Sequence, residues 1–502
     1  MSGVAPAGGE RWTRRRFLSA AGLTLLAAAS PWAPAARAGR RLLVAEDAAA
    51  PDVQTFLSRP DLTPLAVTVD TPASATAPGH VFVAPFKGPG TYGPLILDNR
   101  GEPIWFKPID SPTAMNFRVQ HYRGQDVLTW WEGKVEGGYG GGTGLVFDRA
   151  YQQVARVKAG NGYHSDLHEF IVTSHGTALV AIYLDRRTDA SAIGGPVDGH
   201  VAEGIVQEID IASRRVLFEW HSLDHVGLDE SLLPYGDATG AFDYFHLNSI
   251  AVDTDGHLLV SSRHTSTVFK IDRKSGAIIW RLGGKKSDFA MGPGAAFNFQ
   301  HDARRHADGT ITVFDNGAFA PPGVGAVEPF SRPMRLQIDT TSMTATLAGV
   351  YETSTPRLAF AMGDLQQLPD GGAFVGWGTA GSFTEFAPDG TVVFDAQFAP
   401  EGLSYRAFRY PWAGRPTTLP DVATRRSPAG KTTIHVSWNG ATGVVRWRVA
   451  AGPRADLLRP VRTVPRTGFE TVFTVPRLTG FVAVSALDGH GRVMATSKPA
   501  RA

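Results

Sequence analysis

The chain has 502 residues, with 49 Lys and Arg against 47 Asp and Glu, and no Cys. Near-neutral charge without a basic stretch interleaved with aromatic residues argues against a nucleic-acid partner. The lack of Cys excludes disulfide support, but a chain of this length buries a large core without it. The 56 Gly and 34 Pro predict an all-β protein with many tight turns.

Residues 1–38 are predicted to be an export signal and are left out of the fold. The segment 13–18 reads TRRRFL, an apolar run covers 20–29, and Ala36-Arg37-Ala38 precedes a suitable cleavage position before Gly39. This pattern is typical of a twin-arginine signal. We therefore expect the twin-arginine translocase to export the folded chain, which is then secreted or bound to the cell envelope. The alternative is an N-terminal membrane anchor, for which the apolar run is short.

Residues 39–414 contain a repeat, and the repeat predicts the fold. Each copy has a short apolar strand, a polar turn and a second apolar strand, with turns at positions 98, 148, 210, 272, 339 and 387. Ahead of each hairpin come an inner strand, a Gly-containing turn and another strand. Four antiparallel strands in six copies predict a six-bladed β-propeller, with 403–409 as a strand that closes the first blade. An array of β-sandwiches or a β-helix is the alternative, although this spacing is too long for β-helix rungs.

Residues 415–502 are predicted to form a separate β-sandwich of immunoglobulin or fibronectin type. A Pro-rich linker, GRPTTLPD, leads into short alternating strands with Trp438 and Trp447 at core positions. Nothing in this segment resembles a catalytic cluster. We expect a packing or surface-binding module.

Polar residues share one register on the predicted inner strands. Eight residues before the turn glycines stand Asn116, His168, Asn248 and His301, with Gly363 in the last repeat and Thr71 in the first. His246, two residues before Asn248, faces the same side of its strand. Because inner strands surround the central channel of a propeller, we expect these side chains to form a ligand site. Alternatively, they hydrogen-bond only strand ends and channel water.

No metal site and no cofactor are predicted. His164 and His168 are four residues apart on a strand, and no further ligands follow at a metal-like spacing. The stretch 137–144, GGYGGGTG, lacks the Lys-Ser/Thr of a phosphate-binding loop, so we expect a flexible loop over the channel mouth. Four aromatic residues are expected either to stack on a substrate ring or to pack between blades: Trp130, Trp131, Tyr244 and Trp377.

Several motifs resemble the arylsulfotransferase family, its actinobacterial and fungal branch most of all. They are DLHEF at 166–170, FHLNSI at 245–250, SSRHTS at 261–266, WRLGG at 280–284 and QHD…FDNG at 300–317, and the resemblance covers about 60–412. It implies a six-bladed propeller that moves a sulfuryl group from an aryl sulfate to a phenol. It also implies that no nucleotide donor is used and that the reaction is ping-pong through a sulfohistidine.

The resemblance also implies roles for residues matched by motif. His301 would be the nucleophile, Arg263, His246 and Asn248 would surround the sulfuryl oxygens, and His168 would be a further catalytic histidine. Asn116 and Asp302 are expected to join Asn248 in binding substrate. Asp302 departs from the family pattern, because its carboxylate could raise the pKa of the preceding histidine or repel an anionic donor.

Two other functions stay open on the sequence. The first is a non-catalytic exported propeller that binds an anionic or glycan ligand in its channel. The second is an ester hydrolase or lyase that uses the same histidines with water as acceptor. Neither the natural donor and acceptor nor the oligomeric state follows from the sequence.

Overall fold

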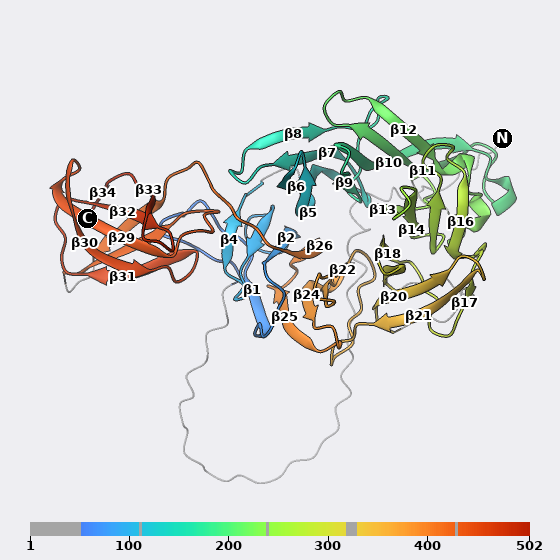
Figure 1. Cartoon of the computed structure of the whole chain (residues 1–502). Coiled ribbons are helices and arrows are strands. Elements are labelled where there is room, and N and C mark those ends of the chain that lie inside the picture. The colour runs from blue at the N-terminus through green and yellow to red at the C-terminus, as the bar shows by residue number, and fades with distance from the viewer. Residues whose placement is uncertain (1–51, 110–112, 237–239, 318–328, 427–429) are drawn as a thin grey trace, which may run out of the picture. The chain divides into compact units, whose positions relative to one another are not determined.

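The computed structural model describes residues 52–502 except 110–112, 237–239, 318–328 and 427–429 (Figure 1). The predicted export signal at 1–38 lies outside the described residues. The described part is all-β, and its helical elements are four single turns: η1 (Ser191–Ile193), η2 (Ser222–Asp224), η3 (Leu228–Glu230) and η4 (Gly378–Ala380). None of the helices in these ranges is long and apolar enough to cross a membrane.

Six antiparallel sheets of four or five strands occupy residues 67–410, and in each the strands run in order from the inner edge outward. Sheet 1 holds β26 (Leu403–Tyr410), β2 (His80–Lys87), β3 (Leu95–Leu97) and β4 (Pro103–Phe106). Sheet 2 holds β5 (Thr113–Tyr122), β6 (Gln125–Glu136), β7 (Tyr139–Phe147) and β8 (Gln153–Val157). Sheet 3 holds β9 (Phe170–Val172), β10 (Thr177–Thr188), β11 (Gly199–Asp210) and β12 (Val216–His221).

The other three sheets follow the same order along the chain. Sheet 4 holds β13 (Leu247–Val252), β14 (Leu258–Ser262), β15 (Thr267–Ile271) and β16 (Ile278–Gly283). Sheet 5 holds β18 (His301–Arg305), β19 (Thr310–Asp315), β20 (Arg332–Asp339), β21 (Thr344–Val350) and β17 (Ala290–Met291), the last paired in parallel. Sheet 6 holds β22 (Asp364–Gln367), β23 (Ala373–Gly376), β24 (Ser382–Phe386), β25 (Val392–Phe398) and β1 (Val67–Thr71).

These sheets contact one another in a closed ring. Each sheet touches the next in chain order, and the inner strands β22 of sheet 6 and β26 of sheet 1 also touch. The antiparallel pairing of β26 with β2 confirms the predicted closing strand. The prediction for Thr71 was wrong: it ends β1, which pairs with β25 at the outer edge of sheet 6. The inner strand of sheet 1 is therefore β26, which comes after the strands of sheet 6 in the sequence.

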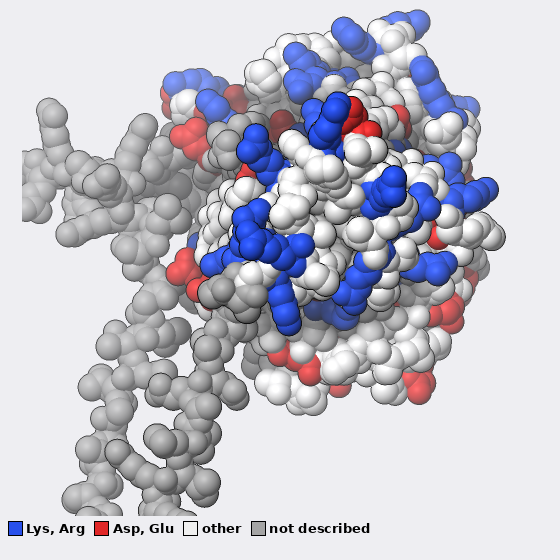
Figure 2. Space-filling model, turned by 90° about the vertical axis from the view of Figure 1, so that its left-hand side faces the viewer, with Lys and Arg blue, Asp and Glu red and all other residues white. Residues whose placement is uncertain are grey.

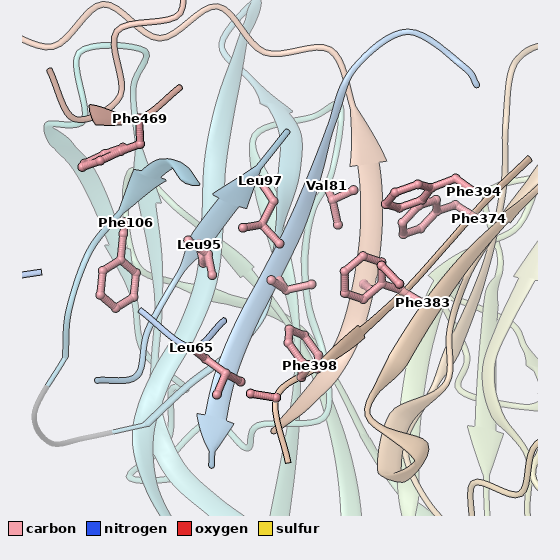
Figure 3. Packing of buried hydrophobic residues seen from close by; sticks show 14 of the residues in the cluster. Leu65, Val81, Leu95, Leu97, Phe106, Phe374, Phe383, Phe394, Phe398 and Phe469 are labelled. Carbon is pink, nitrogen blue, oxygen red and sulfur yellow. The ribbon is translucent and has the colours of Figure 1, made fainter. Parts of the chain in front are cut away.

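Hydrophobic cores fill the interfaces between neighbouring sheets. Figure 3 shows one of them, to which sheet 1 contributes Val81 and Leu95, and sheet 6 contributes Phe374, Phe383 and Phe394. Similar clusters lie at the other interfaces. Because a neighbour covers each face, strands such as β14 and β24 are buried at every position and lack alternation of burial. Burying this apolar area is the main force that holds the sheets together.

The C-terminal residues form two further sheets that share one core. One sheet holds β27 (Asp421–Arg426), β28 (Thr432–Ser437) and β31 (Glu470–Val475). The other holds β30 (Leu457–Pro465), β29 (Arg446–Arg454), β32 (Phe481–Leu487), β33 (Val493–Thr496) and β34 (Ala500–Arg501). Trp438 and Trp447 are buried in this core, as the sequence predicted. The Asn439 side chain bonds both the backbone N–H and the carbonyl of Phe106, at 2.9 and 2.8 Å.

Candidate functional site

The inner strands β5, β13 and β18 each have a β-bulge near their first residues, which changes the direction of the side chains there. Asn116, His246 and Asp302 have positive φ angles of 59°, 54° and 57° beside these bulges. Such conformations are unfavourable for residues other than glycine and are held by surrounding contacts, often at functional sites. The bulges therefore mark the site where the candidate residues meet.

Four imidazoles gather at these strand starts. The ring centroids of His168 and His246 lie 4.9 Å apart, and those of His246 and His264 lie 4.5 Å apart. Tyr405 of β26 lies between His168 and His301, with centroid distances of 5.7 and 6.2 Å. The structure thus brings together histidines that different sheets and their connections contribute, although these residues lie far apart in the sequence.

Each imidazole is oriented through its Nδ1 atom. His168 bonds the Asp166 carboxylate, His246 bonds Asp243 Oδ2 at 2.5 Å, and His264 bonds the Asp243 carbonyl at 2.6 Å. His301 differs, because its Nδ1 bonds the side-chain carbonyl of Asn316 at 2.6 Å. An oxygen acceptor places the proton on Nδ1, so Nε2 is the acceptor nitrogen of each ring. The Met362 backbone N–H donates to His301 Nε2 at 3.3 Å, so this nitrogen has a single, long hydrogen bond.

Burial keeps His246, His264 and His301 neutral. Burial lowers the pKa of His301 well below its ordinary value, the charge of Arg263 adds to this, and the bond to Asn316 opposes it. Burial also lowers the pKa of His246 well below its ordinary value, with contributions from His168 and Arg263. The pKa of His264 falls to about 3, mainly through burial and against the opposing charge of Asp243. Neutral imidazole is the form that acts as a nucleophile or base.

Arg263 supplies a positive charge beside these neutral rings. Its guanidinium donates to His264 Nε2 at 2.9 Å and to the Phe360 carbonyl at 2.8 Å, and it stacks over the Phe299 ring. Its buried Nε has no hydrogen-bond partner among the described residues. Burial lowers the pKa of Arg263 to about 10, so the side chain stays charged at neutral pH. A fixed cation with an unused donor is suited to an anionic ligand.

The comparisons with known proteins agree with this chemistry. The family model described as arylsulfotransferase (ASST) matches residues 118–399, more than half of the chain. The chain belongs to the arylsulfotransferase family. The matched residues include four of the inner strands, β9, β13, β18 and β22. They also include the second half of β5, but not β26. No curated protein matches the chain.

Several solved structures are weakly similar to this chain. A protein of unknown function from Bacteroides caccae has 14% identity and a TM-score of 0.41, covering 66% of this chain and 99% of its own. A protein from Lactobacillus plantarum has 12% identity and a TM-score of 0.34, with coverages of 79% and 99%. A catalytically inactive virginiamycin B lyase from Staphylococcus aureus has 8% identity and a TM-score of 0.30, with coverages of 74% and 91%. These TM-scores are too low to define a shared fold.

Three tyrosines lie among the aromatic side chains around the site histidines. The ring centroids of Tyr139 and Tyr183 lie 4.6 Å apart, and the two rings lie 6.3 and 6.0 Å from that of His246. Burial raises the pKa of Tyr139, of Tyr183 and of Tyr405, so all three keep their phenolic protons. The four aromatics expected as candidates are instead fully buried in the packing cores: Trp130, Trp131, Tyr244 and Trp377. The packing alternative was therefore the right one for them.

The glycine-rich stretch 137–144 was predicted to be a loop, and this was wrong. Residues from Tyr139 onward form β7, paired with β6. A Cβ atom on Gly140 or Gly142 would lie 2.5 or 2.6 Å from the Trp131 ring. Glycine is needed at these positions because the strand lies flat against that indole. The Gly140 N–H then donates to Asp166 Oδ2 at 2.5 Å, which positions the carboxylate behind His168.

Asn116 and Asn248, predicted to bind substrate, bond the protein itself. Asn116 donates to the Leu167 carbonyl at 2.6 Å and accepts from Arg406 at 2.8 Å. Asn248 donates to the Gln300 carbonyl at 2.6 Å. These bonds join sheet 2 to the segment just before β9, and β13 to the segment just before β18. We therefore place both amides behind the histidines, where they hold neighbouring sheets in register.

Asp302 also has partners inside the protein. Its carboxylate accepts from Arg304 at 2.6 Å and lies 3.3 Å from Arg406 Nε. Burial acts to raise its pKa, but the charges of Arg304 and Arg406 outweigh burial and lower it. Asp302 is not among the main causes of the lowered pKa of His301. Arg304 and Arg406 thus offset the negative charge that was expected to oppose an anionic ligand.

A buried ion cluster lies behind the imidazoles. Arg406 is at its centre and bonds both oxygens of Glu169 at 3.1 and 3.2 Å. Glu169 also accepts from Arg304 at 2.5 Å and from Arg118. Burial together with the charge of Asp302 raises the pKa of Asp364 well above its ordinary value. The arginines of this cluster supply the positive charge that stabilises the buried carboxylates of Glu169 and Asp302.

Asp243, His246 and His264 could geometrically surround a metal ion, since their donor atoms lie within 4.8 Å of one another. Their hydrogen bonds do not suit one. Asp243 already accepts from His246 Nδ1, and Arg263 donates to His264 Nε2. A cation at this place would have to displace the guanidinium. The donor set fits a network that orients Arg263 better than it fits a metal centre.

Proposed function

We propose that this protein is an aryl-sulfate sulfotransferase that transfers a sulfuryl group to a phenolic acceptor without a nucleotide donor. One observation carries the proposal: His301 is neutral, its Nδ1 is held by an amide, and Arg263 stands nearby with an unpaired buried donor. An aryl sulfate is an anion whose three sulfuryl oxygens carry charge throughout transfer. Fixed donors around those oxygens are therefore the main requirement for catalysis.

The first step forms a sulfohistidine. His301 Nε2 leaves the Met362 N–H and attacks sulfur, the bond between sulfur and the aryl oxygen breaks, and the phenolate takes a solvent proton relayed by His168 or His246. Arg263 binds the sulfuryl oxygens as the charge moves. In the second step the acceptor phenol loses its proton to the same base, and its oxygen attacks sulfur. The sulfur–nitrogen bond then breaks and His301 is restored, so that a phenol and a new aryl sulfate are the products.

The different partners of the histidines support these roles. Carboxylates bond His168 and His246, and a carboxylate stabilises the imidazolium that a proton-transfer group must form transiently. Asn316 bonds His301 without adding charge. A neutral partner keeps the imidazole unprotonated before attack and lets it leave sulfur in the second step. Of His168, His246 and His301, only His301, the proposed nucleophile, has an uncharged side chain as its Nδ1 partner.

We propose further that the six sheets are the blades of a six-bladed β-propeller whose inner strands carry the site. The closed ring of contacts and the pairing of β26 with β2 support this. The two C-terminal sheets around one core support the proposal of a β-sandwich of immunoglobulin or fibronectin type at 415–502. The segment 1–38 supports export by the twin-arginine route, to the cell envelope or beyond it.

The proposal is tested with 4-nitrophenyl sulfate and phenol. We expect release of 4-nitrophenolate that depends on phenol, and we expect His301→Ala to abolish it. His121→Ala, which removes an exposed histidine bonded to Asp126, is the matched control and should keep full activity. Intact mass after incubation with the donor alone should increase by one sulfuryl group, in the wild type but not in His301→Ala.

Other outcomes assign another function. Continued release in the absence of phenol, beyond one equivalent per chain, would indicate the ester hydrolase alternative. Release that survives His301→Ala would contradict the covalent role. No release from a panel of aryl sulfates would favour the channel-binding module.

A further inference from the structure

The C-terminal residues carry a charge that the rest of the chain does not share. Residues 417–502 contain thirteen Lys and Arg but only four Asp and Glu, whereas the whole chain has 49 and 47. Eleven of the thirteen cations are Arg. Such local excess indicates an interaction with an anionic partner and is unrelated to the fold.

The four acidic residues of this segment are already paired. Asp421 bonds Arg59 at 3.4 Å, Asp456 bonds Arg454 at 2.7 Å and Asp488 bonds Arg492 at 2.8 Å. Glu470 bonds His435 at 2.8 Å. Within the described residues, six of the cations that have no carboxylate partner are Arg425, Arg446, Arg448, Arg459, Arg477 and Lys498. Figure 2 shows Lys and Arg side chains spread over one face of the molecule, with most acidic side chains toward its rim.

The strand register places some of these cations on the outer face of the larger C-terminal sheet. In β29, Trp447 and Val449 point into the core, so Arg446 and Arg448 point outward. Arg448 lies opposite Thr463 of β30 and Ser485 of β32. Ser485 in turn lies opposite Thr496 of β33. A guanidinium therefore stands within a row of hydroxyl side chains that crosses the sheet.

The smaller sheet repeats this arrangement. In β27, Arg425 lies opposite Thr433 of β28, which lies opposite Thr474 of β31. The neighbours of Thr433 in β28, Thr432 and Ile434, are buried, so this second row also faces outward. The edge strand β30, exposed at most positions, adds Arg459 and Arg462, and Arg462 donates to the Thr474 carbonyl at 2.9 Å. Cations and hydroxyls thus occur together on both faces and along the edge between them.

We propose that the C-terminal domain binds an acidic polysaccharide. Guanidinium groups bind carboxylate or sulfate groups through two parallel hydrogen bonds, and Ser and Thr hydroxyls exchange hydrogen bonds with sugar hydroxyls. A flexible polyanion can follow both faces and the edge. A bilayer is flat and can meet only one of them, which makes a membrane a poorer fit.

Single-stranded nucleic acid fits less well too. Its binding surfaces commonly stack bases on exposed aromatic rings. Trp438 and Trp447 are buried in the core, residues 417–502 contain no Tyr, and none of the strongly exposed hydrophobic residues described there is aromatic. The surface therefore offers charge and hydroxyl groups without a stacking platform.

The test compares two full-length variants that lose the same charge. The first is Arg425→Gln/Arg446→Gln/Arg448→Gln/Arg459→Gln. The control is Arg156→Gln/Lys158→Gln/Arg214→Gln/Arg215→Gln, which changes four exposed cations of sheets 2 and 3. Calorimetric binding to polygalacturonate and to heparin is measured as a function of salt, with dextran, single-stranded DNA and phosphatidylglycerol vesicles as other probes.

We expect the wild type and the control to bind both acidic glycans and not dextran. The first variant should bind at least about tenfold more weakly and with a smaller dependence on salt. Its Arg→Lys counterpart should keep most of the salt dependence, and thermal unfolding should match the wild type. The proposal is overturned if the wild type binds neither glycan, if the control loses as much affinity, or if DNA or vesicles bind more tightly than the glycans.

Discussion

The side-chain carbonyl of Asn316 accepts the Nδ1 hydrogen of His301 at 2.6 Å. The Asn316 amide nitrogen donates to the carbonyls of Ala359 and Met362 at 2.7 and 3.0 Å, so the side chain cannot turn around without losing both bonds. The structure therefore presents His301 Nε2 as an acceptor and keeps a carboxylate away from Nδ1. This relationship leads to the first prediction.

Asn316→Asp should slow sulfuryl transfer and move its acid limb to higher pH. The new carboxylate would raise the pKa of His301 by stabilising the imidazolium, which cannot attack. Asn316→Ala should also lower the rate, since the ring loses its orientation, but without that upward move. The measurement is kcat/KM for 4-nitrophenyl sulfate against pH. Identical pH profiles for the two variants would contradict the role given to the neutral partner.

The wild-type enzyme should stay active well below the ordinary histidine pKa of 6.5. The active imidazoles are deprotonated, and burial lowers the pKa of both His301 and His246 well below 6.5. The deprotonated form therefore persists as the pH falls, and the acid limb of kcat/KM lies below 6.5. An acid limb at or above that pH in stopped assays would show that the imidazoles are not shielded as the structure indicates.

The same pKa shifts predict that acid destabilises the fold. Below pH 6.5 the unfolded chain binds protons at these histidines, while the folded chain does not until their lowered pKa is reached. The unfolded state then holds more protons, so the free energy of unfolding falls as the pH decreases through this range. Urea unfolding at a series of pH values between about 4 and 8 measures this free energy. Replacing His301 with Gln should make the free energy of unfolding depend less steeply on pH.

Arg263→Ala should lower kcat/KM by about 10²–10³, the usual cost of removing one preorganised donor to a developing charge. Arg263→Lys keeps the charge but not the planar guanidinium, so we expect its kcat/KM to lie between those of the wild type and Arg263→Ala. Arg156→Ala, which removes an exposed cation of β8, is the control. A change of less than about twofold for Arg263→Ala would rule out its proposed contact with the sulfuryl oxygens.

Gly140→Ala should destabilise the protein by about 1–3 kcal/mol, a typical cost of overpacking. Its Cβ would lie 2.5 Å from the Trp131 ring and 3.1 Å from the Leu167 nitrogen, which would move Asp166 and His168. The neighbouring Gly141→Ala is a matched control, since its Cβ would meet only His164 Cβ at 4.0 Å. Urea unfolding and the transfer assay should both separate the two variants. Equal stability would mean that β7 adjusts freely.

Much of the fold was predictable because it is encoded locally. Alternating apolar residues around Gly- and Asp-containing turns specify hairpins, and six copies of one hairpin pattern indicated the repeated sheets. The closing strand β26 was also found, because its apolar pattern stands just before the Pro-rich linker. The register count nevertheless assigned Thr71 to the inner strand of sheet 1, because it took the turn residues in chain order and did not use the closing strand.

Three of the four histidines described at the site, His168, His246 and His301, were also found from the sequence, through one shared register and the family motifs. Their partners were not. His264 stood beside Arg263 in SSRHTS, and Tyr139 stood inside the glycine-rich stretch, but neither shares the register that was counted. Asn116 and Asn248 share it and still face protein atoms, because the bulges at β5 and β13 turn consecutive side chains in different directions.

The sequence by itself determined the strands, the repeat and the residue types available near the inner strand ends, since these depend on periodicity and turn chemistry over a few residues. Only the tertiary structure decided which nitrogen of each histidine is held, by what partner, and how strongly burial lowers its pKa. Those properties arise from atoms contributed by sheets that are far apart in the sequence, and the electrostatic effect of burial exists only when the sheets have closed around the site.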